Sequence, residues 1–202
     1  EKLKFASLNF PLDIKTKMYL GQLILNNSED VKELDEAESL LLESKKLSPG
    51  RVEPYYLLYN LYSEEGKKAE ARAILEDLAN KLSWYGGVKI MLMSDFYKDN
   101  PERAEELFQE GIKQSGYDDF SGLIKIISYL LDQKRYNETI PYYQELIESR
   151  PERYDYRIDL AKVYYLSGNT DAAVEQINII NEQSPETLKG YEEFINMLYN
   201  KK

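Results

Sequence analysis

The side chains that most often carry out chemistry are scarce in this sequence. Its 202 residues include no His and no Cys, which excludes a thiol nucleophile, a histidine general base, a disulfide framework and a thiolate or imidazole metal site. Adjacent acids occur at Asp118 and Asp119 and at Glu64 and Glu65, and paired carboxylates can perform acid–base chemistry on a sugar. Among 36 acidic residues such neighbours arise by chance, and turns favour them. The sequence therefore predicts no catalytic residue, no metal site and no cofactor, and we expect the protein not to be an enzyme.

Phosphate, nucleic acid and membrane binding are also disfavoured. Gly86 and Gly87 stand where a helix could begin and hold an anion on its N–H groups, but no basic cluster accompanies them. The sequence has no phosphate loop, nucleophile elbow or calcium-loop spacing. Its net charge is −10 and its pI about 4.8, whereas affinity for nucleic acid needs clustered Lys and Arg. No apolar run approaches the roughly 18 to 20 residues of a membrane span, so we expect no direct membrane insertion of this chain.

A regular repeat organises the chain. A small residue recurs at separations of 34, 33, 35 and 34, and a large apolar or aromatic residue follows each one after four positions. The small residues are Ala37, Ala71, Ala104, Thr139 and Ala173. The large residues are Leu41, Leu75, Phe108, Tyr143 and Ile177. Apolar residues spaced by three and four indicate amphipathic helices, and a unit of this length predicts two helices joined by a short turn.

The residues between the helical stretches fit such turns. Gly66 and Gly168 supply the positive φ that ends a helix. Asn100 followed by Pro101 gives an N-cap and then a proline at the first helical position. A single unit cannot bury its apolar stripe, so the units are expected to stack.

This pattern resembles the tetratricopeptide repeat, whose unit has about 34 residues. The fifth unit carries the resemblance most fully, through Leu160, Ala161, Tyr164, Gly168, Ala173 and Pro185. The resemblance implies an all-α, right-handed solenoid of about five helix-turn-helix units followed by a capping helix. The expected boundaries are 1–11 for a linker or a remnant of a preceding segment, 12–49, 50–83, 84–117, 118–151 and 152–185 for the units, and 186–202 for the cap and tail.

The two ends of the array differ from the regular units. We place the first helix at about 12–26 and its partner at about 31–47, with a stretched connection through the polar residues between them. After Pro185, one helix is expected to turn an apolar face towards the array, as an end cap would. Tyr191, Phe194, Ile195 and Leu198 form that face.

In such arrays the first helix of each unit lines an inner, concave face, and the resemblance implies that a protein or peptide partner binds there. The predicted contact residues are Tyr56, Asn60, Lys89, Met93, Phe96, Ser128, Lys162 and Tyr165. Tyr56 occupies the place of a basic residue that a clamp for a terminal carboxylate would need, so that mode is disfavoured. The pentatricopeptide array has units of similar length and binds single-stranded RNA, but the acidic charge and the lack of a Lys/Arg stripe count against it.

The amino-acid sequence of some repeats is similar to that of the helical tail of membrane proteins of the bacterial O-antigen ligase and polymerase family. The residues that carry this similarity are Leu47, Ser48, Pro49, the stretch 51–56, Gly66, Ala71, Trp84, Gly116, Tyr117, the stretch 161–164 and Gly168. It implies an alternative function, as an accessory domain of a polysaccharide-assembly membrane protein, tethered through a part preceding Glu1. Self-association is a third possibility. The sequence leaves the partner, the compartment and the oligomeric state open.

Overall fold

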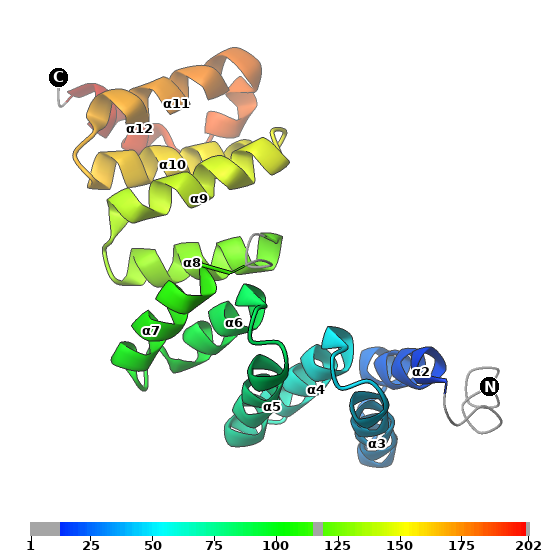
Figure 1. The fold of residues 1–202 in the computed structure, drawn as a ribbon. Helices are drawn as coiled ribbons and strands as arrows, with labels where there is room; N and C mark the ends of the chain where they lie inside the picture. The colour runs from blue at the N-terminus through cyan, green and yellow to red at the C-terminus, as the bar shows by residue number, and fades with distance from the viewer. Residues whose placement is uncertain (1–12, 115–118, 201–202) are drawn as a thin grey trace. The chain divides into compact units, whose positions relative to one another are not determined.

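The computed structural model of the chain describes residues 13–114 and 119–200, in which helices alternate with short connections, as predicted (Figure 1). The predicted linker at 1–11 and Asp118 of the acid pair lie outside these residues. The chain divides into two compact units, Glu1–Ser115 and Gly116–Lys202. Within the described residues, ten of the helices form five consecutive pairs, which confirms the all-α repeat fold.

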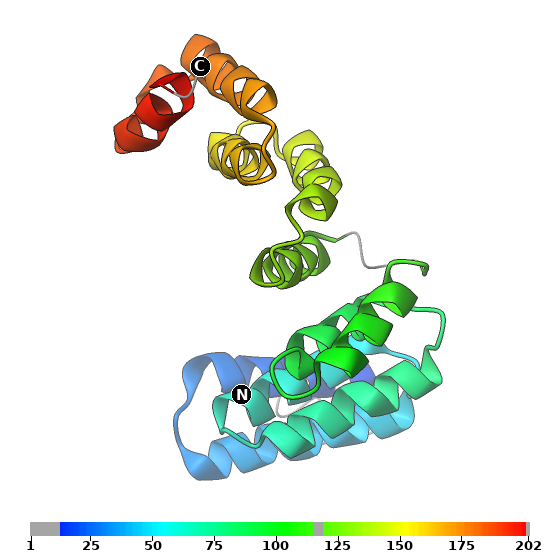
Figure 2. The same cartoon turned by 90° about the vertical axis from the view of Figure 1, so that its left-hand side faces the viewer.

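Unit 1 contains three of these pairs, and each helix packs against the next one along the chain (Figures 1 and 2). Its helices are α2 (Ile14–Asn27), α3 (Val31–Leu47), α4 (Val52–Glu64), α5 (Lys68–Lys81), α6 (Gly86–Phe96) and α7 (Pro101–Gly111). The positions predicted for the first pair are confirmed, but its stretched connection is wrong. Only three residues, 28–30, join α2 to α3. Asn27 stays in α2 and donates to the carbonyl of Leu23 at 2.7 Å, and Asp30 caps α3 by accepting from the N–H groups of Lys32 and Glu33.

Unit 2 contains the other two pairs and the C-terminal helix. Its helices are α8 (Phe120–Asp132), α9 (Tyr136–Ser149), α10 (Tyr154–Leu166), α11 (Thr170–Gln183), the 3₁₀ helix η1 (Pro185–Leu188) and α12 (Glu192–Asn200). The predicted apolar face of α12 is confirmed, because Leu198 is fully buried and Tyr191, Phe194 and Ile195 pack against the core formed by α10 and α11.

The predicted small and large positions form the contacts between paired helices. All five small residues, Thr139 included, are at most 2% exposed, and the large residues that follow them are at most 6% exposed. A small side chain lets two helices approach, and the large one fills the space between them. The repeat spacing thus predicts where the helices of each pair meet.

The third pair departs from the predicted register by one residue. Its connection between α6 and α7 has four residues, 97–100, whereas the connection within each of the other described pairs has three. Leu58 of α4 and Ile90 of α6 are both buried and are equivalent core residues of their pairs. Leu58 precedes the small residue Ala71 by 13 positions, whereas Ile90 precedes the small residue Ala104 by 14. Every side chain of α6 is consequently rotated by about 100° from its predicted direction.

Candidate partner-binding surfaces

The eight predicted contact residues divide between the two units. In unit 1, Tyr56 and Asn60 lie one turn apart on α4, and Asn60 is exposed. The hydroxyls of Tyr56 and Tyr85 are 3.3 Å apart. The ring of Tyr85 lies edge-on to Trp84, with 5.9 Å between centroids, and Trp84 is 62% exposed. Tyr56 therefore belongs to a small aromatic cluster that also contains Tyr85 and Trp84.

The one-residue shift in α6 corrects the positions of the next three predicted residues. Met93 is fully buried and offers no surface to a partner. Lys89 pairs with Glu110 of α7 at 2.9 Å, in a cleft of about 390 Å³ lined by residues of α5 and α7 as well as α6. α5 and α7 are the second helices of their pairs. The Lys89 ammonium therefore lies against second helices, and not on the face of the first helices where it was predicted. Phe96 is partly buried beneath the guanidinium of Arg72, 4.0 Å from the ring centroid.

In unit 2 the structure brings two predicted residues together beside α12. Lys162 forms an ion pair with Asp159 at 2.9 Å, and its ammonium lies 5.0 Å from the ring centroid of Tyr191. Tyr165, in the last turn of α10, meets the ring of Phe194 edge-on, with centroids 6.0 Å apart and planes at 88°. Ser128 is exposed on α8 and does not line this region.

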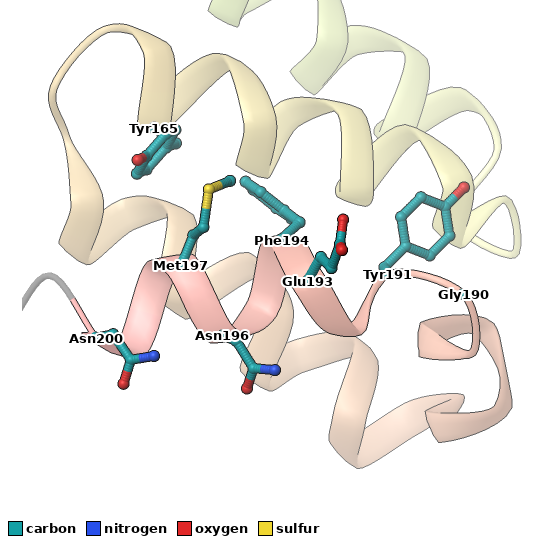
Figure 3. Close-up of a pocket in the computed structure, with 8 residues that line it drawn as sticks. All are labelled: Tyr165, Gly190, Tyr191, Glu193, Phe194, Asn196, Met197 and Asn200. Carbon is teal, nitrogen blue, oxygen red and sulfur yellow. The ribbon is translucent and has the colours of Figure 1, made fainter.

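A groove of about 720 Å³ runs along α12 at this place (Figure 3). Figure 3 shows Phe194 and Met197 projecting from α12 towards the side of Tyr165 on α10. The lining residues are Tyr165, Gly190, Tyr191, Glu193, Phe194, Asn196, Met197 and Asn200. The lining combines aromatic side chains and Met197 with polar side chains, which is a usual composition for a site that binds a protein segment.

Three local features hold α12 in the position that forms the groove. Gly190 has φ +90°, a left-handed conformation that lets the chain turn from η1 into α12. Its N–H donates to the carboxylate of Glu192 at 3.1 Å, and this hydrogen bond lowers the pKa of Glu192. The hydroxyl of Tyr199 donates to the Asn178 side-chain oxygen on α11 at 2.8 Å. With its buried face and both ends fixed in this way, α12 leaves Met197 49% exposed.

Three polar side chains of the groove, on α12, make no polar side-chain contact of their own within the described residues. No side-chain hydrogen bond or ion pair joins Glu193, Asn196 or Asn200 to another residue in the part of the chain that the structure describes. Their spacing of three and four places them on one stripe of α12 with Met197 among them. The sequence gave no sign that this stripe of α12 borders an aromatic groove.

Candidate metal clusters and membrane-spanning helices are absent from the residues that the structure describes. Among residues 13–114 and 119–200, no group of three or more carboxylates is arranged to hold a metal ion. No helix in the same ranges combines the length and the apolar character needed to cross a bilayer.

The stacked helix pairs define the class of a helical-repeat protein, and the comparisons with known proteins give its family. A family model described as the tetratricopeptide repeat matches residues 130–190. The matched part of the chain therefore consists of tetratricopeptide repeats, and the helix pairs of the described residues have the arrangement of TPR proteins. Modules of this family are in general scaffolds for protein–protein interaction and are typically non-catalytic.

Solved structures share the fold at low sequence identity. YrrB, described as a TPR protein with an unusual peptide-binding site, is 18% identical over 92% of this chain and 93% of its own, with a TM-score of 0.58. MamA is 17% identical over 88% of this chain and 94% of its own, with a TM-score of 0.61. A thermophilic TPR protein from Thermus thermophilus is 16% identical over 92% of this chain and 99% of its own, with a TM-score of 0.54.

No curated protein matches the chain. The family match and the structures named above give no support to the narrower resemblance to O-antigen ligases.

Proposed function

We propose that this chain is a non-catalytic recognition module that binds a segment of a protein partner in the groove between α10 and α12. One observation carries the proposal: an exposed Met197 lies among polar side chains that have no partner in the described part of their own unit, beside a wall of packed aromatic rings. An apolar anchor that becomes buried among hydrogen-bonding groups is the arrangement that concentrates binding energy in protein interfaces.

The chemistry of the groove indicates the kind of segment that would bind. An apolar or aromatic side chain of the partner would cover Met197 and contact Tyr165 and Phe194. A basic group would pair with Glu193, and main-chain or side-chain amides would bond to Asn196. The peptide-binding site named in the YrrB structure supports a ligand of this class on the same fold. Tyr56, Asn60 and Ser128 remain predicted contact residues outside the groove.

Selection from a random peptide display library tests the proposal. Peptides are selected on the full chain and then measured by titration against Met197→Asp and against Leu42→Asp. Leu42 is 40% exposed on α3, so its variant is a matched control outside the groove. We expect Met197→Asp to weaken binding of the selected peptides at least tenfold, about 1.4 kcal/mol, and Leu42→Asp to leave it unchanged. Peptides that bind all three proteins equally would place the site elsewhere.

A further inference from the structure

One other helix carries an exposed stripe whose chemistry matches that of the groove. On α2, Lys15, Tyr19 and Leu23 follow one another at intervals of four and lie on one side of the helix. Tyr19 is 54% and Leu23 50% exposed, and Lys15 is exposed as well. These are large exposed fractions for an aromatic and an aliphatic side chain on the same face, so this stripe has the character of an interaction surface.

The two helices have opposite charge. α2 contains two lysines and no acidic residue, whereas α12 contains two glutamates and no basic residue. Neither Lys15 nor Glu193 forms an ion pair within the described residues. The Asp13 carboxylate before α2 interacts electrostatically with Lys15 but accepts its hydrogen bond from Thr16, and the second lysine of α2, Lys17, is buried and pairs with Glu43. The exposed stripe of α2 therefore presents a cation that a partner can pair with, and the exposed stripe of α12 presents an anion of the same kind.

We propose that the partner segment of the groove is helix α2 of a second copy of this chain, an inference that rests on the function proposed above. In a parallel alignment the Lys15 ammonium faces the Glu193 carboxylate and Tyr19 covers Met197. In both helices the charged residue precedes the apolar one by four positions, about 6 Å along the axis. The two contacts can therefore form at the same time.

The two surfaces are different, so the association is heterologous and each copy can bind two others. Such contacts produce rings or open chains and not a closed symmetric dimer. A contact made by one helix on each side is smaller than the roughly 800 Å² per partner of standard interfaces. We therefore expect weak association, visible as a mass that rises with protein concentration. Copies with a net charge of −10 repel one another, but within a Debye length the local Lys15–Glu193 attraction opposes this repulsion.

Charge reversal tests the alignment. Sedimentation of the full chain over a concentration series is compared for Lys15→Glu, Glu193→Lys, the double variant, and the control Glu182→Lys, an exposed position on α11. We expect each reversal in the stripes to lower the association constant at least tenfold, and the double variant to restore it to within about threefold of the unmodified chain. Glu182→Lys should change it less than threefold. Far-UV circular dichroism checks that all variants remain folded.

A mixing experiment tests that the two surfaces are different. Tyr19→Asp removes binding by the exposed stripe of α2 and keeps the groove intact. Met197→Asp removes binding by the groove and keeps the stripe of α2 intact. Each variant alone should remain monomeric, and a mixture should form a 1:1 complex that does not grow further, because the remaining pair of surfaces carries two aspartates.

Each unfavourable result has a definite meaning. An unmodified chain that stays monomeric at every concentration overturns the inference, as does a double variant that fails to recover or a mixture that forms no complex. If the chain is monomeric but displayed peptides still bind in a Met197-dependent way, the groove binds a different protein. The proposed function then stands and the self-association fails.

Discussion

Arg72 links two successive helix pairs in unit 1, and replacing it measures how much this link contributes to stability. From α5, its guanidinium donates to the Asp95 carboxylate at 2.6 Å and to the Asp95 carbonyl at 3.1 Å. It also donates to Asp99 at 3.1 Å and lies over the ring of Phe96. The carboxylates raise the already high pKa of Arg72, so it stays charged. Arg72→Met removes these contacts and keeps the apolar stem of the side chain.

The contacts differ in strength because their exposure differs. The Arg72 and Asp95 side chains are 26% and 19% exposed, and a charge-assisted hydrogen bond in such a setting contributes about 1.5–3 kcal/mol. The bond to the carbonyl adds about 1 kcal/mol, and the stacking on Phe96 about 0.5–1 kcal/mol. Asp99 is 66% exposed and adds little. Because these contributions are not additive, we expect Arg72→Met to lower the free energy of unfolding by about 2–4 kcal/mol.

Urea denaturation provides the measurement, followed by circular dichroism and by fluorescence. Trp84 is the only tryptophan of the sequence and lies between α5 and α6, so its emission reports on this part of unit 1. Arg103→Met is the matched control. Its ion pair with Glu106 joins side chains that are 43% and 63% exposed, so a loss of at most about 0.5 kcal/mol is expected. Equal losses for the two variants would refute the assignment of Arg72 as a link between pairs.

Four further substitutions test three other features of the fold. Lys134 has φ 57°, at the position where the connections at Gly66 and Gly168 have glycine. Lys134→Gly should therefore raise the free energy of unfolding by about 0.5–1 kcal/mol. Gly66→Lys should lower it by about 1 kcal/mol in the same denaturation assay. Ala173 is fully buried, so Ala173→Leu should cost about 1–3 kcal/mol by overpacking; an unchanged melting temperature would contradict its place between helices. The hydrogen bond from Lys89 lowers the pKa of Glu110. The pair therefore contributes its full stabilisation above the usual carboxyl pKa of about 4.3, and this contribution is lost as the pH falls through the lowered pKa. Glu110→Gln should therefore lose less stability between pH 6 and pH 3 than the unmodified chain, and an equal loss would show that the pair is unimportant.

The repeat spacing predicted the helix pairs because it reflects the packing that forms them. Ala37 and Ala173 recur where two helices approach most closely, and Leu41 and Ile177 fill the space beside them. These requirements act within one pair and involve residues close in sequence. They leave a pattern that a single sequence shows, even where Thr139 replaces alanine.

The direction of each exposed side chain was harder to predict, because it depends on the length of a turn. One additional residue in 97–100 moves Met93 from a predicted surface position into the core and turns Lys89 towards α7. The polar composition of that turn gives no indication of its length, since Asp99 and Asn100 fit a connection of either size. A one-residue error in the predicted register is a small displacement along the chain, but it turns each side chain by about 100° around the helix axis.

The groove in unit 2 shows why binding residues are less visible in sequence than core residues. Tyr165 was predicted as a contact residue, and the structure places it beside Phe194, a residue predicted only to cap the array. The capping helix performs both roles because its buried face needs only Leu198 and its neighbours, which leaves Glu193 and Met197 free to vary without loss of stability. An exposed methionine and unpartnered polar groups on such a helix do not stabilise the described part of its own unit. We infer that they are explained by a partner, and the charge-reversal pair identifies that partner as a second copy or excludes it.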